Sequence, residues 1–165
     1  MPQKGFVVVT DRGGHLHNAQ MLLAQMALGP EALVTTYGPD IAPMRTTEVF
    51  EGSKIISIPH SFTWLGKVRI WNPFKFTLQC MITLFLVIYL RPKHIVSLGG
   101  SNVVPFCYWA KLLGAKVWHV ECMNQVVTPS ITGRLLYPIC NELFVQWKEL
   151  ELAYPDKASY WGWVL

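Results

Sequence analysis

Short apolar runs alternate with stretches of helical spacing along this chain. The first run, residues 5–10, is rich in β-branched side chains and is typical of a buried parallel strand. Residues 15–28 then repeat apolar side chains at the spacing of one helix face, and Gly29–Pro30 ends that helix. The order strand, turn, helix recurs along the chain and predicts a doubly wound α/β sheet.

The same patterns locate the other elements. Apolar runs bounded by turns predict strands at 5–10, 32–36, 54–58, 95–98, 115–120 and 143–146, and a last short strand or a linker at 159–165. Helical spacing predicts helices at 15–28, 76–90, 106–113, 131–137 (with Thr128 as its N-cap) and 147–153, and the polar segments 37–52 and 60–72 are predicted to be loops. We expect one Rossmann-like domain over 1–165, with a mostly parallel sheet and helices on both faces.

Two glycine pairs follow predicted strands. Gly13–Gly14 comes after the first strand and Gly99–Gly100 after the fourth, where glycine lets the backbone turn sharply and approach a ligand. Ser101 or Asn102 is expected to cap the helix behind the second pair, with Pro105 at its start. Helix N-termini behind such turns suit phosphate groups. The first turn has neither the Walker pattern nor G-x-G-x-x-G, so those two kinds of nucleotide site are not indicated.

His15 is the first side chain after the first glycine pair. Its position suits a chemical role at a helix N-terminus, and Arg12 could add charge-assisted hydrogen bonds to a phosphate. A helix-capping or solvent-facing histidine has the same pattern, so this alternative stays open.

Polar residues also gather where the fifth strand ends. Ligands in open α/β sheets bind outside the carboxyl ends of the strands, and His119, Glu121, Asn124 and Gln125 lie at such an end. Glu121 is a candidate site residue, although a loop carboxylate that pairs locally has the same position. A metal site that combines His119, Glu121 and Cys122 is not expected, because neighbouring residues of a strand point to opposite faces.

The segment 76–90 is apolar on nearly every side. It has no charged residue, and Lys75, Gln79 and Thr83 form one narrow polar stripe. It is shorter than the roughly 20 apolar residues of a membrane span, yet a helix lying on a sheet needs only one apolar stripe. We therefore expect a helix at about 74–90 with one face on the sheet and another against lipid or a partner protein, inserted in the membrane without crossing it.

Tryptophan and basic residues precede this segment in the loop 60–72. The mixture is typical of a membrane interface, and a partly buried surface loop is an equal alternative. The side chains expected to contact the membrane are Trp64, Trp71, Phe76, Phe85 and Leu86.

Composition narrows the class of partner. The formal net charge is +4 with no Arg/Lys cluster, which argues against nucleic acid and suits an anionic membrane surface or a phosphorylated ligand better. The four cysteines are widely spaced without a C-x-x-C pair, so we expect reduced thiols in a reducing cytosol. The first apolar run is too short for a signal peptide and is followed at once by Asp11–Arg12.

An ordered set of motifs resembles the N-terminal half of MurG-type GT-B glycosyltransferases over essentially the whole chain. The set comprises Gly13-Gly14-His15, Gly99-Gly100-Ser101-Asn102, His119-Val120-Glu121 and residues 128–136. The likeness is closer to split members of that group. These are the membrane-anchoring subunit of the two-chain UDP-GlcNAc transferase of dolichol-linked oligosaccharide synthesis and its bacterial exopolysaccharide and capsule relatives of the PssD type, which 129–147 resembles. Asp11–Arg12 departs from the small residues common in these relatives.

The resemblance implies a glycosyltransferase subunit without cofactor or metal. This domain would bind a polyprenyl-diphosphate-linked sugar acceptor, and a smaller partner chain would bind the UDP-sugar donor, giving a heterodimer at the cytoplasmic face of the inner (plasma) membrane. His15 would be the base and Glu121 a catalytic cleft residue. The acceptor diphosphate would lie against Arg12, Gly13, Gly14, Gly99, Gly100, Ser101, Asn102 and Asn124.

The length favours the split arrangement. The 165 residues leave no room for a second sheet domain, so we expect the chain alone to be inactive. As a departure from the eukaryotic subunits, we expect no N-terminal transmembrane anchor, so membrane attachment would fall to the 76–90 helix. Two other interpretations stay open: a non-catalytic membrane scaffold that recruits and activates a catalytic glycosyltransferase, and a self-contained small α/β nucleotide-binding protein.

Overall fold

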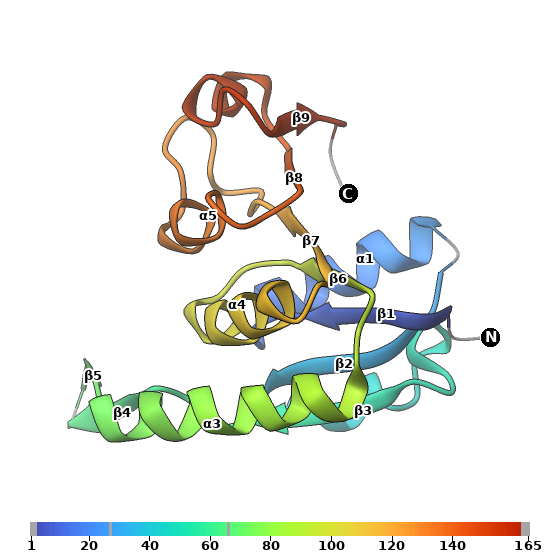
Figure 1. Ribbon diagram of the computed structural model, residues 1–165, viewed down its shortest axis with the longest axis vertical. Coiled ribbons are helices and arrows are strands. Elements are labelled where there is room, and N and C mark those ends of the chain that lie inside the picture. Colours follow the sequence, from blue (N-terminus) through green and yellow to red (C-terminus); the bar gives the residue numbers. More distant parts are fainter. Residues whose placement is uncertain (1–2, 27, 66, 163–165) are drawn as a thin grey trace.

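A seven-stranded parallel sheet carries helices on both faces in the computed structural model, which describes residues 3–26, 28–65 and 67–162 (Figure 1). The strand order is β3-β2-β1-β6-β7-β8-β9, and all neighbours in it pair in parallel. This arrangement confirms the predicted fold class. The strands are β1 (Gln3–Val9), β2 (Pro30–Thr36), β3 (Lys54–Ile58), β6 (His94–Ser97), β7 (Lys116–Val120), β8 (Glu142–Val145) and β9 (Ala158–Tyr160).

Two apolar clusters cover the two faces of the sheet. Val7 and Val9 of β1 belong to the cluster under α3, α4 and α5, whereas Val8 packs with Leu16 and Leu23 of α1 on the opposite face. Successive side chains of a strand point to opposite faces, so a strand covered on both sides must be apolar throughout. The helices are α1 (Gly14–Met26), α2 (Ile41–Met44), α3 (Pro73–Leu90), α4 (Val104–Leu112) and α5 (Ile131–Leu136).

Several local expectations were wrong. The predicted loop 60–72 contains an antiparallel hairpin, β4 (Phe62–Leu65) and β5 (Val68–Trp71), and 37–52 contains α2 and the 3₁₀ turn η1 (Glu48–Phe50). The predicted helix 147–153 is a 3₁₀ helix, η3 (Lys148–Ala153). Of the last predicted segment, Ser159 and Tyr160 lie in β9, and 163–165 fall outside the described residues.

Two predicted helix caps were also wrong. Ser130, two residues after Thr128, caps α5 by accepting from the Gly133 N–H at 2.8 Å. Behind the second glycine pair, the 3₁₀ turn η2 (Ser101–Val103) precedes α4 without a side-chain cap, because Asn102 bonds to other elements. Pro105 does lie in the first turn of α4.

Helix α3 turns its polar stripe inward. Gln79 and Thr83 are fully buried against the domain, and the Thr83 hydroxyl donates to the Gln79 carbonyl at 2.8 Å. The outward face is apolar, with Phe74 86% and Phe85 65% exposed. Among the described residues, α3 is the one helix long and apolar enough to cross a membrane by length and composition. Of the predicted stripe, Gln79 and Thr83 face the protein interior, whereas Lys75 in the first turn of the helix is exposed. The other exposed apolar residues of α3 are Leu78, Met81, Ile88 and Tyr89.

Candidate functional site

The two glycine pairs meet at the carboxyl edge of the sheet, where β1 and β6 lie side by side. Strand order reverses at this point, since β2 follows β1 toward one edge and β7 follows β6 toward the other. In open α/β sheets this switch point is where the crevice for a ligand opens. The sequence prediction that the two glycine turns share one edge is thus confirmed.

Asp11 ties the two turns together. Its backbone N–H donates to the Gly99 carbonyl at 3.1 Å, and its carboxylate accepts from the Asn102 side-chain amide at 2.9 Å and from the Thr36 hydroxyl. Gly100 has a φ of 92°, and a Cβ there would collide with the Asp11 side chain. The second turn therefore requires glycine, both for its left-handed backbone and for this close approach.

His15 projects from the start of α1 toward the second turn. Its Nδ1 lies 3.1 Å from the Leu98 carbonyl and 3.2 Å from the Cys122 sulfur. Nδ1 donates to the Leu98 carbonyl in one neutral tautomer and accepts from the Cys122 thiol in the other. A Cβ on Gly99 would lie 2.9 Å from the ring, so that glycine makes room for the imidazole. These contacts fix the ring through Nδ1 beside the second glycine turn.

The first turn leaves an open backbone surface. A Cβ placed on Gly13 or Gly14 would meet no atom within 4 Å, and both residues are exposed. The Gly13 N–H donates to Asp40 at 2.8 Å, whereas the Arg12 side chain lies over Gly38. Arg12 is thus exposed, and its side chain lies beside the loop after β2.

Asn102 is fully buried at the centre of a polar network. Its side-chain oxygen accepts from the Ser61 hydroxyl at 3.0 Å and from the Gln79 amide at 3.2 Å, while its amide donates to Asp11. Gln79 also donates to the Asn102 carbonyl at 3.2 Å. The interior of α3 is therefore hydrogen-bonded, through one side chain, to both glycine turns.

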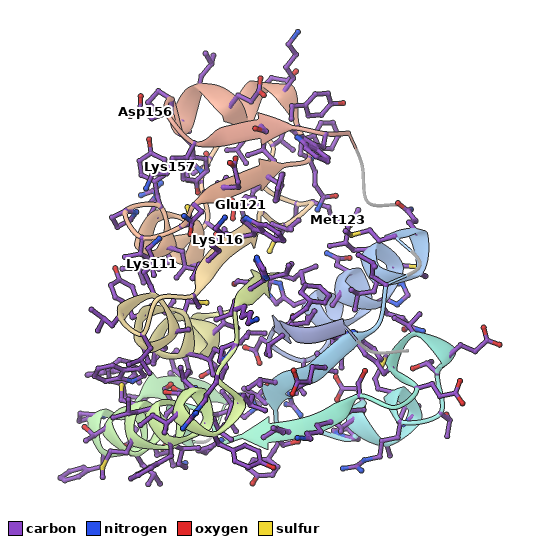
Figure 2. All side chains as sticks on the ribbon, turned by 45° about the vertical axis from the view of Figure 1, so that its right-hand side comes forward. Lys111, Lys116, Glu121, Met123, Asp156 and Lys157 are labelled. Atoms are coloured by element: carbon purple, nitrogen blue, oxygen red, sulfur yellow. The ribbon has the colours of Figure 1, made fainter. Side chains whose placement is uncertain are left out.

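Glu121 follows the end of β7 (Figure 2) and is 1% exposed. Its carboxylate accepts from His119 Nε2 at 2.9 Å, from the Ser130 N–H at 2.5 Å and hydroxyl at 2.9 Å, and from the Tyr154 hydroxyl at 3.2 Å. In turn, His119 Nδ1 lies 3.2 Å from the Ser97 hydroxyl at the end of β6. These contacts join β6, β7, the start of α5 and the end of η3.

Two pKa shifts follow from this network. Burial raises the pKa of Glu121, but the hydrogen bond and charge of His119 and the two bonds from Ser130 together outweigh it and hold the pKa below its ordinary value. Burial, and secondarily the Glu121 charge, raises the pKa of Cys122 to about 12. Glu121 is therefore a carboxylate and Cys122 a thiol at neutral pH.

Two further predicted site residues lie at the protein surface. Ser101 and Asn124 are exposed at the same edge as the glycine turns. In the described part of the chain no group of three or more His, Cys, Asp or Glu residues could hold a metal ion. All four cysteines are free thiols, as expected.

The side chains predicted to contact the membrane differ in their exposure. Trp71 and Phe85 are 52% and 65% exposed, whereas Phe76 and Leu86 are half-buried, and Leu86 packs against the core. The side chain of Trp64 lies outside the described part of the structure.

Sequence reasoning missed Asp11, Gln79 and Ser61 as site-organising residues. A buried amide on an otherwise apolar helix was the available signal for Gln79, since a polar group in such a place needs a hydrogen-bonding partner. Nothing in the local sequence signals that Ser61 and Asp11 meet Asn102.

Comparison with known proteins gives a family match over residues 7–164, to "Oligosaccharide biosynthesis protein Alg14 like". Relatives named UDP-N-acetylglucosamine transferase subunit ALG14 include those of Candida albicans, 25% identical over 94% of this chain and 75% of its own length, and of Rattus norvegicus, 24% identical over 96% and 82%. The Yarrowia lipolytica relative is 35% identical, but the match covers 44% of this chain and only 36% of the relative.

Solved structures of the same fold are longer than this chain. Acinetobacter baumannii MurG superposes with a TM-score of 0.65 at 19% identity, covering 87% of this chain and 41% of MurG. The UDP-N-acetylglucosamine 2-epimerase of Rickettsia bellii gives a TM-score of 0.71 at 10% identity, covering 96% and 44%. At these identities the likeness describes fold alone, namely that of one half of a GT-B enzyme. From the family match, which extends over nearly the whole sequence, the chain belongs to the Alg14-like oligosaccharide biosynthesis proteins.

Proposed function

We propose that this chain is the acceptor-side subunit of a two-chain, UDP-sugar-dependent glycosyltransferase that acts on a polyprenyl-diphosphate-linked sugar. The observation that carries the proposal is the position of His15. Its Nδ1 is held by the Leu98 carbonyl, and its ring lies between two glycine turns at the switch point of the sheet. The family match and the names of the relatives support the class of reaction.

In this proposal His15 is the general base. The acceptor hydroxyl gives its proton to Nε2 as its oxygen attacks the anomeric carbon of the donor sugar, and the bond from that carbon to UDP breaks. The nucleotide leaves as a diphosphate, whose charge is stabilised by the partner chain. The histidine is pre-oriented by Leu98, so no rotation of the ring is needed when the acceptor arrives.

The acceptor diphosphate is proposed to lie against the open first turn. Gly13 and Gly14 have no side chains in the way, and the N–H groups in the first turn of α1 favour an anion, although the Gly13 N–H itself donates to Asp40. Exposed Ser101 and Asn124 line the same edge. Asn102 and Glu121 act as positioning residues, because both are buried and fully engaged with protein groups.

Helix α3 is proposed to hold this edge against the membrane. Its inward face is hydrogen-bonded to the second turn, and its outward face offers apolar side chains that water does not favour. The N-terminal end of α3 and the β4–β5 hairpin adjoin Ser61, which bonds to Asn102. A lipid-linked acceptor would then enter near the glycine turns. We place the protein on the cytoplasmic face of the membrane and assign it to bacterial exopolysaccharide or capsule synthesis, from the run 129–147.

Reconstitution tests the proposal. The purified chain, the partner chain and their mixture are each given UDP-GlcNAc and a polyprenyl-diphosphate-linked sugar in vesicles. Turnover by the mixture alone is expected, and turnover by either chain alone would refute the division of labour. Tight binding of UDP by the isolated chain would instead favour a self-contained nucleotide-binding protein. A membrane scaffold would keep the full activity of the complex after His15→Ala.

A further inference from the structure

A group of basic residues lies at the amino ends of the strands, at the opposite edge of the sheet from the glycine turns. The C-terminal ends of α3 and α4 and the amino ends of β6 and β7 enclose a cavity of about 580 Å³. Arg91, Lys93, His94 and Lys116 line it together with Ile88 and Leu113. We call it the basic pocket.

The cations of the basic pocket have no acidic partner. Within the described ranges the single ion pair is His119–Glu121, so Arg91, Lys93 and Lys116 are not paired with a carboxylate there. All three are exposed at the surface. Three uncompensated positive charges around one concave site attract an anion.

Exposed apolar side chains lie at and beside this pocket. Ile88 is 49% exposed on the outward face of α3, and Leu112 and Leu113 at the end of α4 are 73% and 61% exposed. An apolar rim beside a basic pocket matches the boundary where acyl chains meet headgroups, and it does not match a site for a soluble phosphate.

Arg91 occupies a position that normally favours glycine. It ends α3 with a φ of 46°, and it is the one non-glycine residue with positive φ in the described structure. The left-handed conformation costs free energy for a residue with a Cβ. A cation is thus held at the mouth of the pocket where glycine would be the more stable choice.

We propose that the basic pocket binds the headgroup of an anionic phospholipid. The inference rests on the proposed membrane association of α3. With its outward face on the bilayer, α3 brings two places to the membrane surface: the second glycine turn, bonded to the helix at Gln79, and the basic pocket at Arg91, about 18 Å further along the helix axis. Two separated contacts with the membrane fix the angle between α3 and the bilayer surface. A single apolar face does not fix this angle. The phosphate of the headgroup pairs with Arg91 and Lys116, and its acyl chains lie over Ile88 and Leu113.

Vesicle binding by the full chain tests the pocket. Partitioning is measured with vesicles of neutral phosphatidylcholine and with vesicles containing phosphatidylglycerol. The double variant Arg91→Gln/Lys116→Gln is compared with Arg45→Gln/Lys148→Gln, which removes the same charge from exposed positions outside the pocket. We expect the pocket variant to lose roughly 30-fold in partitioning onto anionic vesicles and the control less than threefold, since each cation near the surface contributes about fivefold. Neither variant should change binding to neutral vesicles.

The outcomes separate the two proposals. If wild-type protein binds neither kind of vesicle, the membrane association of α3 fails. If it binds both equally, or if the control variant loses as much as the pocket variant, the headgroup site alone is refuted. If the pocket variant keeps anionic binding but no longer retains the partner chain, the pocket is a protein interface and the lipid proposal is wrong. Arg91→Gly guards against misfolding: it should raise the melting temperature and still lower anionic binding.

Discussion

The Asp11 carboxylate accepts a hydrogen bond from the Asn102 side-chain amide at 2.9 Å, and this contact joins the two glycine turns. The two residues lie 91 positions apart in the sequence, at the ends of neighbouring strands β1 and β6. Asn102 is bonded in turn to Gln79 of α3. The geometry of the proposed acceptor site therefore depends on a helix whose other face is apolar and exposed.

Removal of the Asp11 carboxylate should destabilise the fold more than removal of an exposed carboxylate does. Asp11→Ala leaves the buried Asn102 amide and the Thr36 hydroxyl without their acceptor, which is expected to cost about 2 kcal/mol in unfolding free energy. Urea denaturation measures this cost. Asp156→Ala, which removes an exposed carboxylate with one 3.4 Å contact, should change stability by less than about 0.5 kcal/mol. Equal effects of the two variants would contradict the linking role of Asp11.

Helix α3 should lose stability when its buried polar residue is made apolar, and it should keep its stability when an exposed apolar residue is made polar. Gln79→Leu makes the helix more apolar, yet it strands Ser61 and Asn102 in the interior and should destabilise the domain by about 2 kcal/mol. Leu78→Gln, at a neighbouring position that is 52% exposed, should leave stability within about 0.5 kcal/mol and reduce vesicle partitioning roughly tenfold.

Paired stability and vesicle assays on these two variants make the comparison. A Gln79→Leu protein as stable as wild type would contradict the structural role of the buried polar network. A Leu78→Gln protein that binds vesicles as wild type does would place the lipid-facing surface elsewhere.

Much of this architecture follows from the sequence because it is local. A strand such as 5–10 is covered on both faces and must be apolar throughout, so its composition identifies it without knowledge of its neighbours. The glycine pairs likewise mark turns at strand ends. Glu121 was located at the right edge for the same reason, but its burial depends on Tyr154, which is 33 positions away. Contacts between residues so far apart in the sequence, including that of Ser61 with Asn102, produce no periodic pattern in the sequence.

The hairpin β4–β5 shows a different limit. Phe62–Trp64 and Val68–Ile70 alternate apolar and polar residues, and the two residues between the paired Leu65 and Val68 begin with glycine, so the sequence did contain a hairpin signal that the loop prediction overlooked. The strands of the hairpin pair with each other outside the main sheet, so tertiary packing decides the conformation.

Acid should weaken the fold partly through Glu121. Its pKa in the folded state lies below the ordinary value of 4.5, so the ionised carboxylate stabilises the fold above that value, and this contribution is lost as the pH falls through the lower folded pKa. Glu121→Gln should cost about 2 kcal/mol at pH 7, because His119 and Ser130 lose a charged acceptor.

Urea unfolding from pH 7 down to pH 3 measures both effects. The wild-type protein should lose stability over the acid range, and the variant should lose less over the same range. Parallel curves for the two proteins would show that Glu121 is not ionised in the folded state.

The end of α3 offers a stabilising substitution. Arg91→Gly relieves the left-handed backbone at φ 46° and is expected to raise the unfolding free energy by about 1 kcal/mol. Arg91→Ala, which keeps the Cβ but removes the charge, should give no such gain. Thermal melts of both variants check this, and a destabilised Arg91→Gly would mean that the guanidinium makes a structural contribution larger than the backbone strain.

The rate of the reconstituted two-chain complex after His15→Ala tests the central claim most directly. His17→Ala, two residues further along α1 and exposed, is the matched control. A base that removes the acceptor proton is worth roughly 10²–10⁴ in kcat, so His15→Ala should lose a factor of that size with little change in KM for the UDP-sugar, while His17→Ala should stay near the wild-type rate. A His15→Ala complex that turns over within twofold of wild type would contradict the account.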